Sequence, residues 1–263
     1  MDRWIRRSLE RLFWDRIFVS NATRHSQAAA LIRSLRPVGV PGGLRRFGPA
    51  GDGGYLMPDD LDGVVASISP GVSSECGFDE AIASRGIDVL LADASVSAPP
   101  VQHPRFRFWP KFLDVSSSPQ TLTLDELGQE IKADGDLIMQ MDIEGAEYRV
   151  LYSISDALLK RLRIIVVEFH ELDQIFSRFG FDIIKPVFGK LTAHHSVVHI
   201  HPNNVSQPVI RGDLSVPPVM EFTFCRKDRM GGGEAPQPAY PHRLDAPCVS
   251  SRPTYELPSC WRR

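Results

Sequence analysis

The sequence predicts an α/β fold with a seven-stranded, mostly parallel sheet that contains one antiparallel strand and carries helices on both faces. Two observations support this prediction. From about residue 64 onwards, short apolar runs alternate with helical patterns, which is typical of parallel strands joined by helical crossovers. The last two apolar runs have no helical pattern between them, so a terminal hairpin is expected to supply the antiparallel strand.

The elements can be assigned in chain order. A first helix is expected over 22–35, before a Pro/Gly-rich link at 37–43. Strands are then expected over 64–69, 87–92, 104–108, 136–141, 163–168, 196–201 and 219–225. Further helices are expected over 78–85, 123–132, 145–152, 155–161, 171–178 and 181–190.

Length and composition favour one principal domain with appendages. The chain has 263 residues, of which 43% are hydrophobic, enough for a substantial core. We expect a helical extension over 1–40, the main domain over 41–230 and a flexible Pro/Gly-rich tail over 231–263.

The extension opens with apolar residues at helical spacing over 4–17, with arginines between them. Charges interrupt every apolar run, so neither a signal peptide nor a membrane span is predicted. This amphipathic helix is expected to pack on the sheet or on another subunit of a homo-oligomer, with peripheral membrane contact as the alternative.

Charge and cysteine usage exclude some classes of partner and site. The formal net charge is −2, whereas nucleic-acid binding normally leaves a strongly basic surface, so no nucleic-acid partner is expected. The four cysteines show no Cys-x-x-Cys spacing, which predicts neither a zinc site nor a disulfide framework. A reducing, cytoplasmic location follows as the expectation.

Two neighbouring strands are expected to end in groups that can carry chemistry. One apolar run ends in Asp142, is followed by Glu144 and turns on Gly145 into a helical pattern. The next run ends in Glu168 and His170. In an open α/β sheet, ligands bind outside the carboxyl ends of the strands, so a reaction is expected here. The alternative is a plain strand-to-helix turn with two solvated acids.

A nucleoside site is expected at the ends of the first two strands. Ser69, Gly71 and Ser73 belong to a small-residue turn that lets the backbone approach a ligand. Asp93 ends the next strand 22 positions after Gly71, close to the roughly 20-residue interval expected for a ribose-binding acid. The turn lacks Gly-x-Gly-x-x-Gly, which favours a ligand without phosphates. Asp52 lies in a glycine-rich loop that either closes over the ligand or is only a turn.

Aromatic residues cluster just beyond this acid. Phe106, Phe108, Trp109 and Phe112 are expected in the core or in a subunit contact, because aromatic side chains are ordinarily buried. Stacking on an adenine ring is the alternative.

Together these segments resemble the FkbM-type family of S-adenosylmethionine-dependent methyltransferases, from about Gly51 to His201. The most specific part, Met141-Asp-Ile-Glu-Gly-Ala-Glu-Tyr-Arg-Val-Leu151, is similar to the family's Asp-(Val/Ile)-Glu-Gly-Ala-Glu signature. Thr123-Leu-Asp-Glu-Leu127 lies upstream and Val167-Glu168 downstream, in the expected order. The Gly-Asp-Gly-Gly-Tyr segment at 51–55 and the His-x-His-Pro-Asn-Asn segment at 199–204 resemble one subgroup.

The resemblance implies a class I methyltransferase fold, with a Rossmann-like sheet, and S-adenosyl-L-methionine as cofactor. By this likeness Gly71, with Ser69 and Ser73 beside it, holds the methionine part, and Asp93 holds the ribose. Asp52 and Asp142 are also expected in the cofactor site. The first turn departs from the family's Asp-x-Gly-Ala-Asn-x-Gly pattern, with Ser69 at the acid position and Glu75 at the second glycine.

Two mechanisms fit the expected residues. In the first, Asp142, Glu168 and His199, or His201 in its place, bind Mg²⁺ or Mn²⁺, which lowers the pKa of an acceptor hydroxyl. In the second, no metal is present and His170 or His199 is the general base. His199 and His201 lie on one face of a strand by the period of two, so a solvated sheet face is the alternative.

The sequence therefore predicts an O-methyltransferase for a hydroxyl of a small polar acceptor, with the resemblance indicating a sugar or glycan. A polyketide-like natural product is the alternative acceptor. A non-catalytic nucleoside-binding regulator of the same fold and a dinucleotide-dependent oxidoreductase are the alternative functions. The weak glycine turn argues against the dinucleotide.

Overall fold

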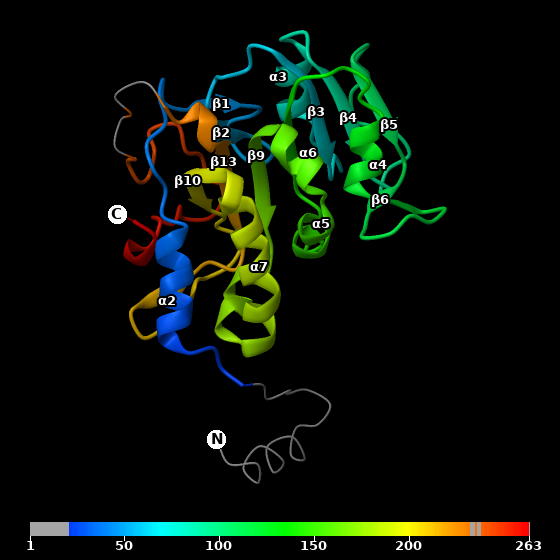
Figure 1. Ribbon diagram of the computed structural model, residues 1–263. Helices are drawn as coiled ribbons and strands as arrows, with labels where there is room; N and C mark the ends of the chain where they lie inside the picture. The colour runs from blue at the N-terminus through cyan, green and yellow to red at the C-terminus, as the bar shows by residue number, and fades with distance from the viewer. Residues whose placement is uncertain (1–20, 232–234, 236–237, 263) are drawn as a thin grey trace.

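The structure is a computed structural model that describes residues 21–231, 235 and 238–262. Figure 1 shows a twisted sheet with helices on both faces. Among the described residues, no helix is both long enough and apolar enough to cross a membrane. The amphipathic helix expected over 4–17 lies outside these residues.

The central sheet has seven strands in the order β10-β13-β9-β8-β3-β4-β5. Strand β13 is antiparallel to both of its neighbours, and the other pairs are parallel. The predicted α/β class, strand count and single antiparallel strand are therefore confirmed. Their bounds are β3 (Val64–Pro70), β4 (Asp88–Ala92), β5 (Phe106–Trp109), β8 (Asp136–Met141), β9 (Leu162–Phe169), β10 (His195–Pro202) and β13 (Met220–Arg226).

The strand order places a switch point between β3 and β8. From β3 the chain builds outwards through β4 and β5, and then returns to β8 on the other side of β3. The helices that leave β3 and β8 consequently diverge, which opens a crevice at the carboxyl ends of these two strands. Ligands of open α/β sheets bind at such a position.

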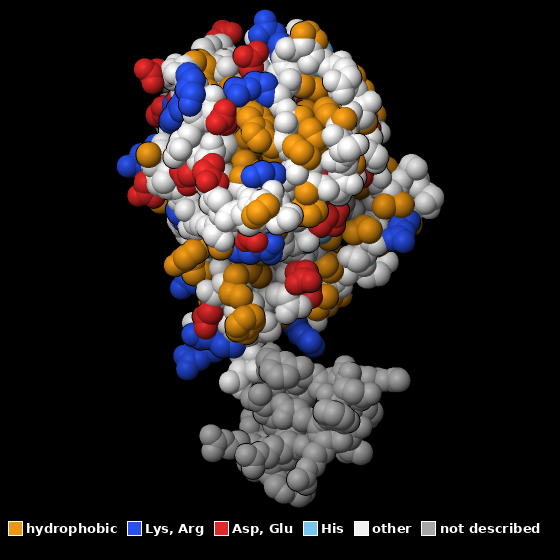
Figure 2. All heavy atoms as spheres, turned by 90° about the vertical axis from the view of Figure 1, so that its right-hand side faces the viewer, with side chains coloured by type: hydrophobic (Ala, Val, Ile, Leu, Met, Phe, Trp, Pro, Cys, Tyr) orange, Lys and Arg blue, Asp and Glu red, His pale blue; other side chains and the backbone are white. Residues whose placement is uncertain are grey.

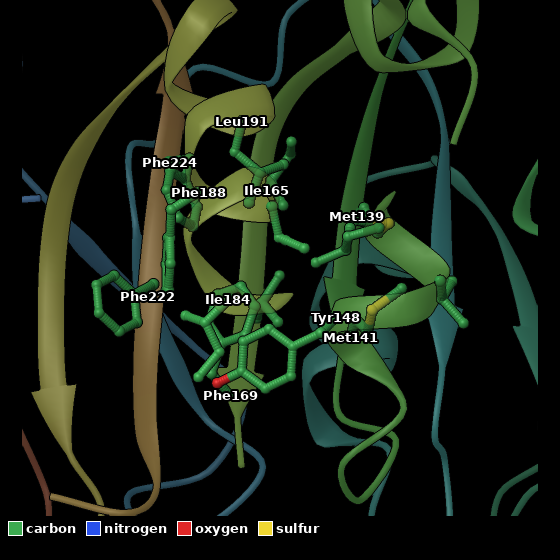
Figure 3. Packing of buried hydrophobic residues seen from close by; sticks show 14 of the residues in the cluster. Met139, Met141, Tyr148, Ile165, Phe169, Ile184, Phe188, Leu191, Phe222 and Phe224 are labelled. Atoms are coloured by element: carbon green, nitrogen blue, oxygen red, sulfur yellow. The ribbon is translucent and has the colours of Figure 1, made fainter. Parts of the chain in front are cut away.

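Alternate residues of the central strands feed two hydrophobic cores. Leu137, Met139 and Ile165 lie in one core and Ile138 and Ile164 in the other, as the pleat requires. Figure 3 shows part of the first core, where Phe188 packs between Phe169, Phe222 and Phe224.

The helices and a hairpin cover these two faces. The first core receives α2 (His25–Ser34), α4 (Leu124–Gln129), α5 (Glu147–Ser153), α6 (Asp156–Arg161) and α7 (Arg178–His194). The second receives α3 (Gly77–Ala83) and the hairpin of β1 (Arg45–Phe47) and β2 (Tyr55–Met57). Helix α2, which belongs to the extension expected over 1–40, packs into the main core.

The segment after β9 differs from its prediction. Instead of two helices over 171–178 and 181–190, the chain forms a short 3₁₀ turn, η1 (Leu172–Phe176), followed by one continuous helix, α7. Ser177 begins α7, because its hydroxyl accepts a hydrogen bond from the Gly180 N–H. Pro186 stays within the helix. Short paired strands β6 (Phe112–Leu113), β7 (Thr121–Leu122), β11 (Val209–Arg211) and β12 (Leu214–Val216) were not predicted.

The described part of the C-terminal segment is packed against the domain, which corrects the expected flexible tail. Leu257 and Trp261 are buried in the main core, and the Trp261 Nε1–H donates to the Ser215 carbonyl at 3.0 Å. The short helix η3 (Ser259–Trp261) lies beside α2 (Figure 1). Apart from η3, the described residues of this segment form no helix or strand, as its breaker-rich composition predicts, but two apolar side chains anchor it.

Candidate active site

The turn after β3 meets the end of β8 so closely that only glycine fits. Gly71 has a φ of +90°, and a Cβ built on it would lie 1.5 Å from the Asp142 carbonyl oxygen. The Asp142 N–H donates to the Pro70 carbonyl at 3.3 Å, which joins the two strand ends. The glycine predicted to hold the cofactor therefore also determines where Asp142 stands.

Asp93 organises the loops at the end of β4. Its Oδ2 accepts a hydrogen bond from the Ser73 N–H at 2.8 Å, and its Oδ1 accepts one from the Ser95 N–H at 2.7 Å. Each carboxylate oxygen keeps further acceptor capacity. Ser73 itself has a φ of 43°, so this acid holds the turn in a left-handed conformation.

A cavity of about 440 Å³ opens beside these groups. Gly71, Ser73, Asp93 and Asp142 line it, as expected for the cofactor site. Its volume lies within the range of roughly 300–1,000 Å³ that is usual for small-molecule sites, so the residues present fit a nucleoside. The cavity thus brings together four of the predicted cofactor residues.

The opposite wall of this cavity contains two residues, Asp114 and Arg149, that were not predicted. Phe112, Asp114 and Arg149 line it, and the Arg149 Nε–H donates to Asp114 at 3.0 Å. Phe112 is 52% exposed, which rules out the expected core position but leaves the expected subunit contact untested. Its ring instead faces the cavity, where the alternative role of adenine stacking is available to it. The apolar character of Phe112 is all that the sequence shows, so it could not separate these roles.

Ser69 does not contact either cavity of this site, although it was expected to bind the cofactor. It is 1% exposed, and its hydroxyl donates to Gln140 Oε1 at 2.7 Å. Gln140 in turn donates to the Tyr55 hydroxyl at 3.2 Å. Because Ser69 is buried in β3, it cannot reach a ligand in either cavity. Its hydrogen bond instead helps to position Gln140 and Tyr55.

A second, smaller cavity of about 130 Å³ adjoins the first. Asp52 and Tyr55 line it, and Gly71, Asp142 and Glu144 belong to the walls of both cavities. Asp52 is exposed in the loop between β1 and β2, where the sequence placed it. The two cavities therefore meet at Asp142.

Asp142, Glu168 and His170 come together at this junction. One ligand atom from each lies within 4.8 Å of the others. Asp142 Oδ1 and Glu168 Oε2 are buried and have no hydrogen-bond partner, while Glu168 Oε1 accepts from Asn203 at 3.1 Å. Orphaned buried oxygens of this kind call for a cation or a proton, so the set fits a divalent ion with oxygen and imidazole ligands.

Glu147 orients His170 in this group. It is fully buried, and its Oε1 lies 3.2 Å from His170 Nδ1 while also accepting from the Ile143 and Gly145 N–H groups. With a proton on Nδ1, the other ring nitrogen faces the carboxylates of Asp142, Glu144 and Glu168 at 3.5–3.9 Å.

The protonation equilibria of the cluster are strongly shifted. Burial raises the pKa of Asp142 to about 7, although His170 opposes the shift. Burial and then the neighbouring Asp142 raise the pKa of Glu168. Burial would lower the pKa of His170, but the hydrogen bond to Glu147 and the surrounding carboxylates outweigh it and raise that pKa. Perturbed groups of this kind are typical of catalytic sites.

At the opposite end of β8, arginines balance the charge of an acid, Asp136. Asp136 binds Arg163 and Arg226 at 2.6–2.8 Å, and the hydrogen bond from Arg226 lowers its pKa. Within the described part of the chain, Asp142 and Glu168 have His170 as their only ion-pair partner. The carboxyl groups of Asp142 and Glu168, which no arginine or lysine of the described residues binds, therefore lie at the end of the sheet that carries the cavities.

His199 is not part of this cluster, which corrects its expected role as a metal ligand and base beside Asp142. Its Nε2 lies 2.9 Å from Asp245 Oδ1, and it lines a separate cavity of about 260 Å³ with His242. It belongs to no ligand-rich group found in the described residues. The reason is that Asp245 of the C-terminal segment packs against it, a contact across 46 residues that no local pattern shows. His170, rather than His199, lies beside Asp142 and Glu168.

This strand order, with one antiparallel strand and a nucleoside-sized cavity at the switch point, defines a class I methyltransferase fold, for which S-adenosylmethionine is the implied cofactor. Residues 71–194 match the family model described as "Methyltransferase FkbM domain". The match runs from the turn after β3 to the end of α7 and contains Asp93, Asp142, Glu168 and His170.

Two solved methyltransferases illustrate the distance to known structures. The N-methyltransferase NodS from Bradyrhizobium japonicum has 12% identity and a TM-score of 0.33, and the alignment covers 63% of this chain and 88% of NodS. A TehB-like SAM-dependent methyltransferase from Corynebacterium glutamicum has 13% identity and a TM-score of 0.31, over 85% of this chain and 96% of the other. Such values carry no argument about substrate. No curated protein matches the chain.

Proposed function

We propose that this protein is an S-adenosylmethionine-dependent O-methyltransferase that acts on a hydroxyl of a small polar acceptor, with a sugar or glycan as the acceptor class. The observation that carries the proposal is the cluster of Asp142, Glu168 and His170 at the junction of the two cavities. It puts proton-accepting and cation-binding groups beside the place where the reacting atoms would meet.

The larger cavity is proposed to bind the cofactor. When bound, S-adenosylmethionine supplies an electrophilic methyl group on a sulfonium. Asp93 can accept from the two ribose hydroxyls with its remaining lone pairs, and Phe112 offers a ring for the adenine. Gly71 and Asp142 wall the end of the cavity that opens towards the acceptor.

The smaller cavity is proposed to hold the acceptor hydroxyl. Asp52, Tyr55 and Gln140 are polar groups around it that can orient hydroxyl-bearing ligands. Orientation of the oxygen in line with the methyl group supplies much of the rate. As the new O–CH₃ bond forms and the S–CH₃ bond breaks, the hydroxyl proton passes to a group at Asp142 or His170, and a neutral thioether leaves.

Two versions of this proton transfer fit the cluster. In the first, Asp142, Glu168 and His170 hold Mg²⁺ or Mn²⁺, which lowers the pKa of the hydroxyl. In the second, the buried Asp142 and His170 accept the proton without a metal. The orphaned oxygens of Asp142 and Glu168 favour the first version.

Other partners and functions are less well supported. On the face seen in Figure 2, Lys and Arg side chains are interspersed with Asp and Glu, which favours an acceptor other than nucleic acid. A polyketide-like natural product stays the alternative acceptor, and a non-catalytic nucleoside-binding regulator the alternative function. A cytoplasmic location and a homo-oligomeric state remain predictions.

Transfer of a labelled methyl group from S-adenosylmethionine to a panel of mono- and oligosaccharides, with polyketide alcohols as comparison, tests the proposal. We expect label in at least one hydroxyl acceptor and none with the Asp142→Asn variant. Label only in amines or carboxylates would refute O-methylation. Cofactor binding with no transfer to any acceptor class would favour the regulator.

A further inference from the structure

Two acids and a histidine of neighbouring strands form a row across the sheet. Glu221 of β13 pairs with Glu168 of β9 on one side and with His201 of β10 on the other. Directly opposed residues of paired strands carry their side chains on the same face, about 4.5–5.5 Å apart at Cβ. Glu221 is 6% exposed and His201 is 4% exposed, so the row is buried.

The C-terminal segment places a thiol against this row. Cys248 Sγ donates a hydrogen bond to Glu221 Oε1 at 3.3 Å. One ligand atom each of His201, Glu221 and Cys248 lies within 4.8 Å of the others. None of the three belongs to the Asp142, Glu168 and His170 cluster, so this is a separate group of potential ligands.

His201 shows the geometry of a histidine ligand. Its Nδ1 lies 3.7 Å from Asp245 Oδ2, while its Nε2 is buried and has no hydrogen-bond partner. A buried nitrogen without a partner is costly. Metal-binding histidines ordinarily turn one ring nitrogen to a carboxylate and the other to the ion, which is the arrangement that Asp245 and His201 offer.

We propose that His201, Glu221 and Cys248 form a second, transition-metal site, selective for Zn²⁺ or an ion of similar softness. One imidazole, one carboxylate and one thiolate are ligands that Zn²⁺ accepts, whereas Mg²⁺ and Ca²⁺ avoid sulfur. The ion displaces the thiol proton to solvent and satisfies His201 Nε2. Bond lengths of about 2.0–2.3 Å require only small side-chain movements from the observed spacing.

Such an ion would fasten the C-terminal segment to the sheet. Cys248 is the only one of the three ligands that the segment contributes, and Asn204 already binds the carbonyls of Val249, Arg252 and Pro253 beside it. Since one atom of Cys248 also lies within 4.8 Å of Asp52 and Glu168, the fastened segment borders the acceptor side of the active site. The proposal does not depend on methyl transfer.

Cobalt substitution tests the site without an activity assay. The full chain is stripped with a chelator and titrated with Co²⁺, and the thiolate-to-metal charge-transfer band is recorded, which only a cysteine ligand produces. We expect a saturable band that is displaced by Zn²⁺. Asp142→Asn and Cys260→Ser should keep the band, because neither residue touches the cluster, whereas Cys248→Ser should lose it.

A second pair of variants guards against misfolding of Cys248→Ser. Asp245→Asn leaves all three ligands in place and should weaken Co²⁺ binding about 10–100-fold, as loss of a carboxylate behind a ligating histidine does. Glu221→Gln should weaken it as well. Absence of the band from folded wild-type protein, or an undiminished band in folded Cys248→Ser, would overturn the proposal.

Discussion

At the scale of single residues, the site is defined by acids that no arginine or lysine of the described chain binds. Asp136 and Asp142 flank the same strand and are both half-buried, yet two arginines bind the first, while the second has a buried oxygen without a hydrogen-bond partner. Burial without compensation is costly to stability. The fold retains this arrangement at the end of the sheet where the two cavities meet, which is why we assign the chemistry to Asp142.

Replacing Asp142 by Asn should therefore separate catalysis from cofactor binding. The amide keeps the shape of the side chain but can neither accept the proton nor bind a cation as a carboxylate does. We expect kcat to fall by about 10²–10⁴-fold, with the affinity for S-adenosylhomocysteine retained. Steady-state kinetics and calorimetry measure the two effects. Asp134→Asn, at an exposed position away from both cavities, is the control, and equal activity of both variants would exclude Asp142 from the reaction.

Gly71 and Gly145 provide a matched test of the close approach between the turn after β3 and the end of β8. Both have positive φ values, +90° and +97°, but a Cβ on Gly71 would meet the Asp142 carbonyl, whereas a Cβ on Gly145 would meet nothing within 4 Å. Gly145→Ala should cost only the backbone strain of about 1–2 kcal/mol. Gly71→Ala should cost about 2–5 kcal/mol because the clash adds to that strain. Chemical denaturation measures both, and equal losses would contradict the close approach.

At the scale of elements, the seven strands were predictable and several connections were not. Strands such as 136–141 are apolar runs bounded by polar or breaker residues, and local pattern suffices to find them. The join of η1 and α7 depends on the Ser177 cap and on how Gly180 passes Gln174, where a Cβ would lie 2.4 Å from the Gln174 carbonyl. Steric contacts of this kind are invisible in the sequence.

Helix α3 carries a buried acid whose titration should be visible in the stability. Burial raises the pKa of Asp79 to about 7, above its usual value of 3.8. The folded state therefore holds the proton more tightly than the unfolded state, and this carboxyl stabilises the fold at low pH. That contribution, on the order of 4 kcal/mol, is lost as the pH rises from about 4 to about 7.

Asp79→Asn should remove this component of the pH dependence. The variant should be more stable than the wild type at pH 8, and its unfolding free energy should fall less between about pH 4 and pH 7. Urea denaturation at several pH values measures both. Glu80→Gln, at the neighbouring and more exposed position, should keep the wild-type profile. A steep fall that persists in Asp79→Asn would assign the effect to another group.

At the scale of the whole molecule, the C-terminal segment joins the domain and shapes the outer side of the site. The His-x-His-Pro-Asn-Asn segment explains how: His199 and His201 face Asp245, Asn203 donates to Glu168, and Asn204 binds the chain near Val249. Sequence resemblance marked the segment as important. It could not show that its partners lie more than 30 residues away in either direction.

Part of the candidate site could also be predicted from local sequence patterns. Asp93, Asp142, Glu168 and His170 could be found because each ends a strand of a parallel sheet, where side chains converge. His199 was misplaced because Asp245 of the C-terminal segment packs against it. Glu147 was missed because its role depends on His170, which lies on the next strand.

Replacing Trp261, which anchors the C-terminal segment, should test how much this segment stabilises the fold. Trp261 is fully buried against Phe222, with ring centroids 5.9 Å apart. Trp261→Ala should cost about 3–5 kcal/mol, whereas Glu256→Ala, at an exposed position, should be close to neutral. Thermal and chemical unfolding of the full chain measure the difference. A neutral Trp261→Ala would mean that the segment contributes little to the fold.

The most direct test of the central claim is calorimetric titration of the chelator-treated full chain with S-adenosylhomocysteine, repeated with Mg²⁺ and Mn²⁺ and with NAD as comparison. We predict binding of the homocysteine nucleoside at one site, preserved in Asp142→Asn, weakened in Asp93→Ala and absent for NAD. A dependence on the divalent ion that disappears in Asp142→Asn would support the metal version. No binding of the nucleoside to folded protein under any of these conditions would contradict the account.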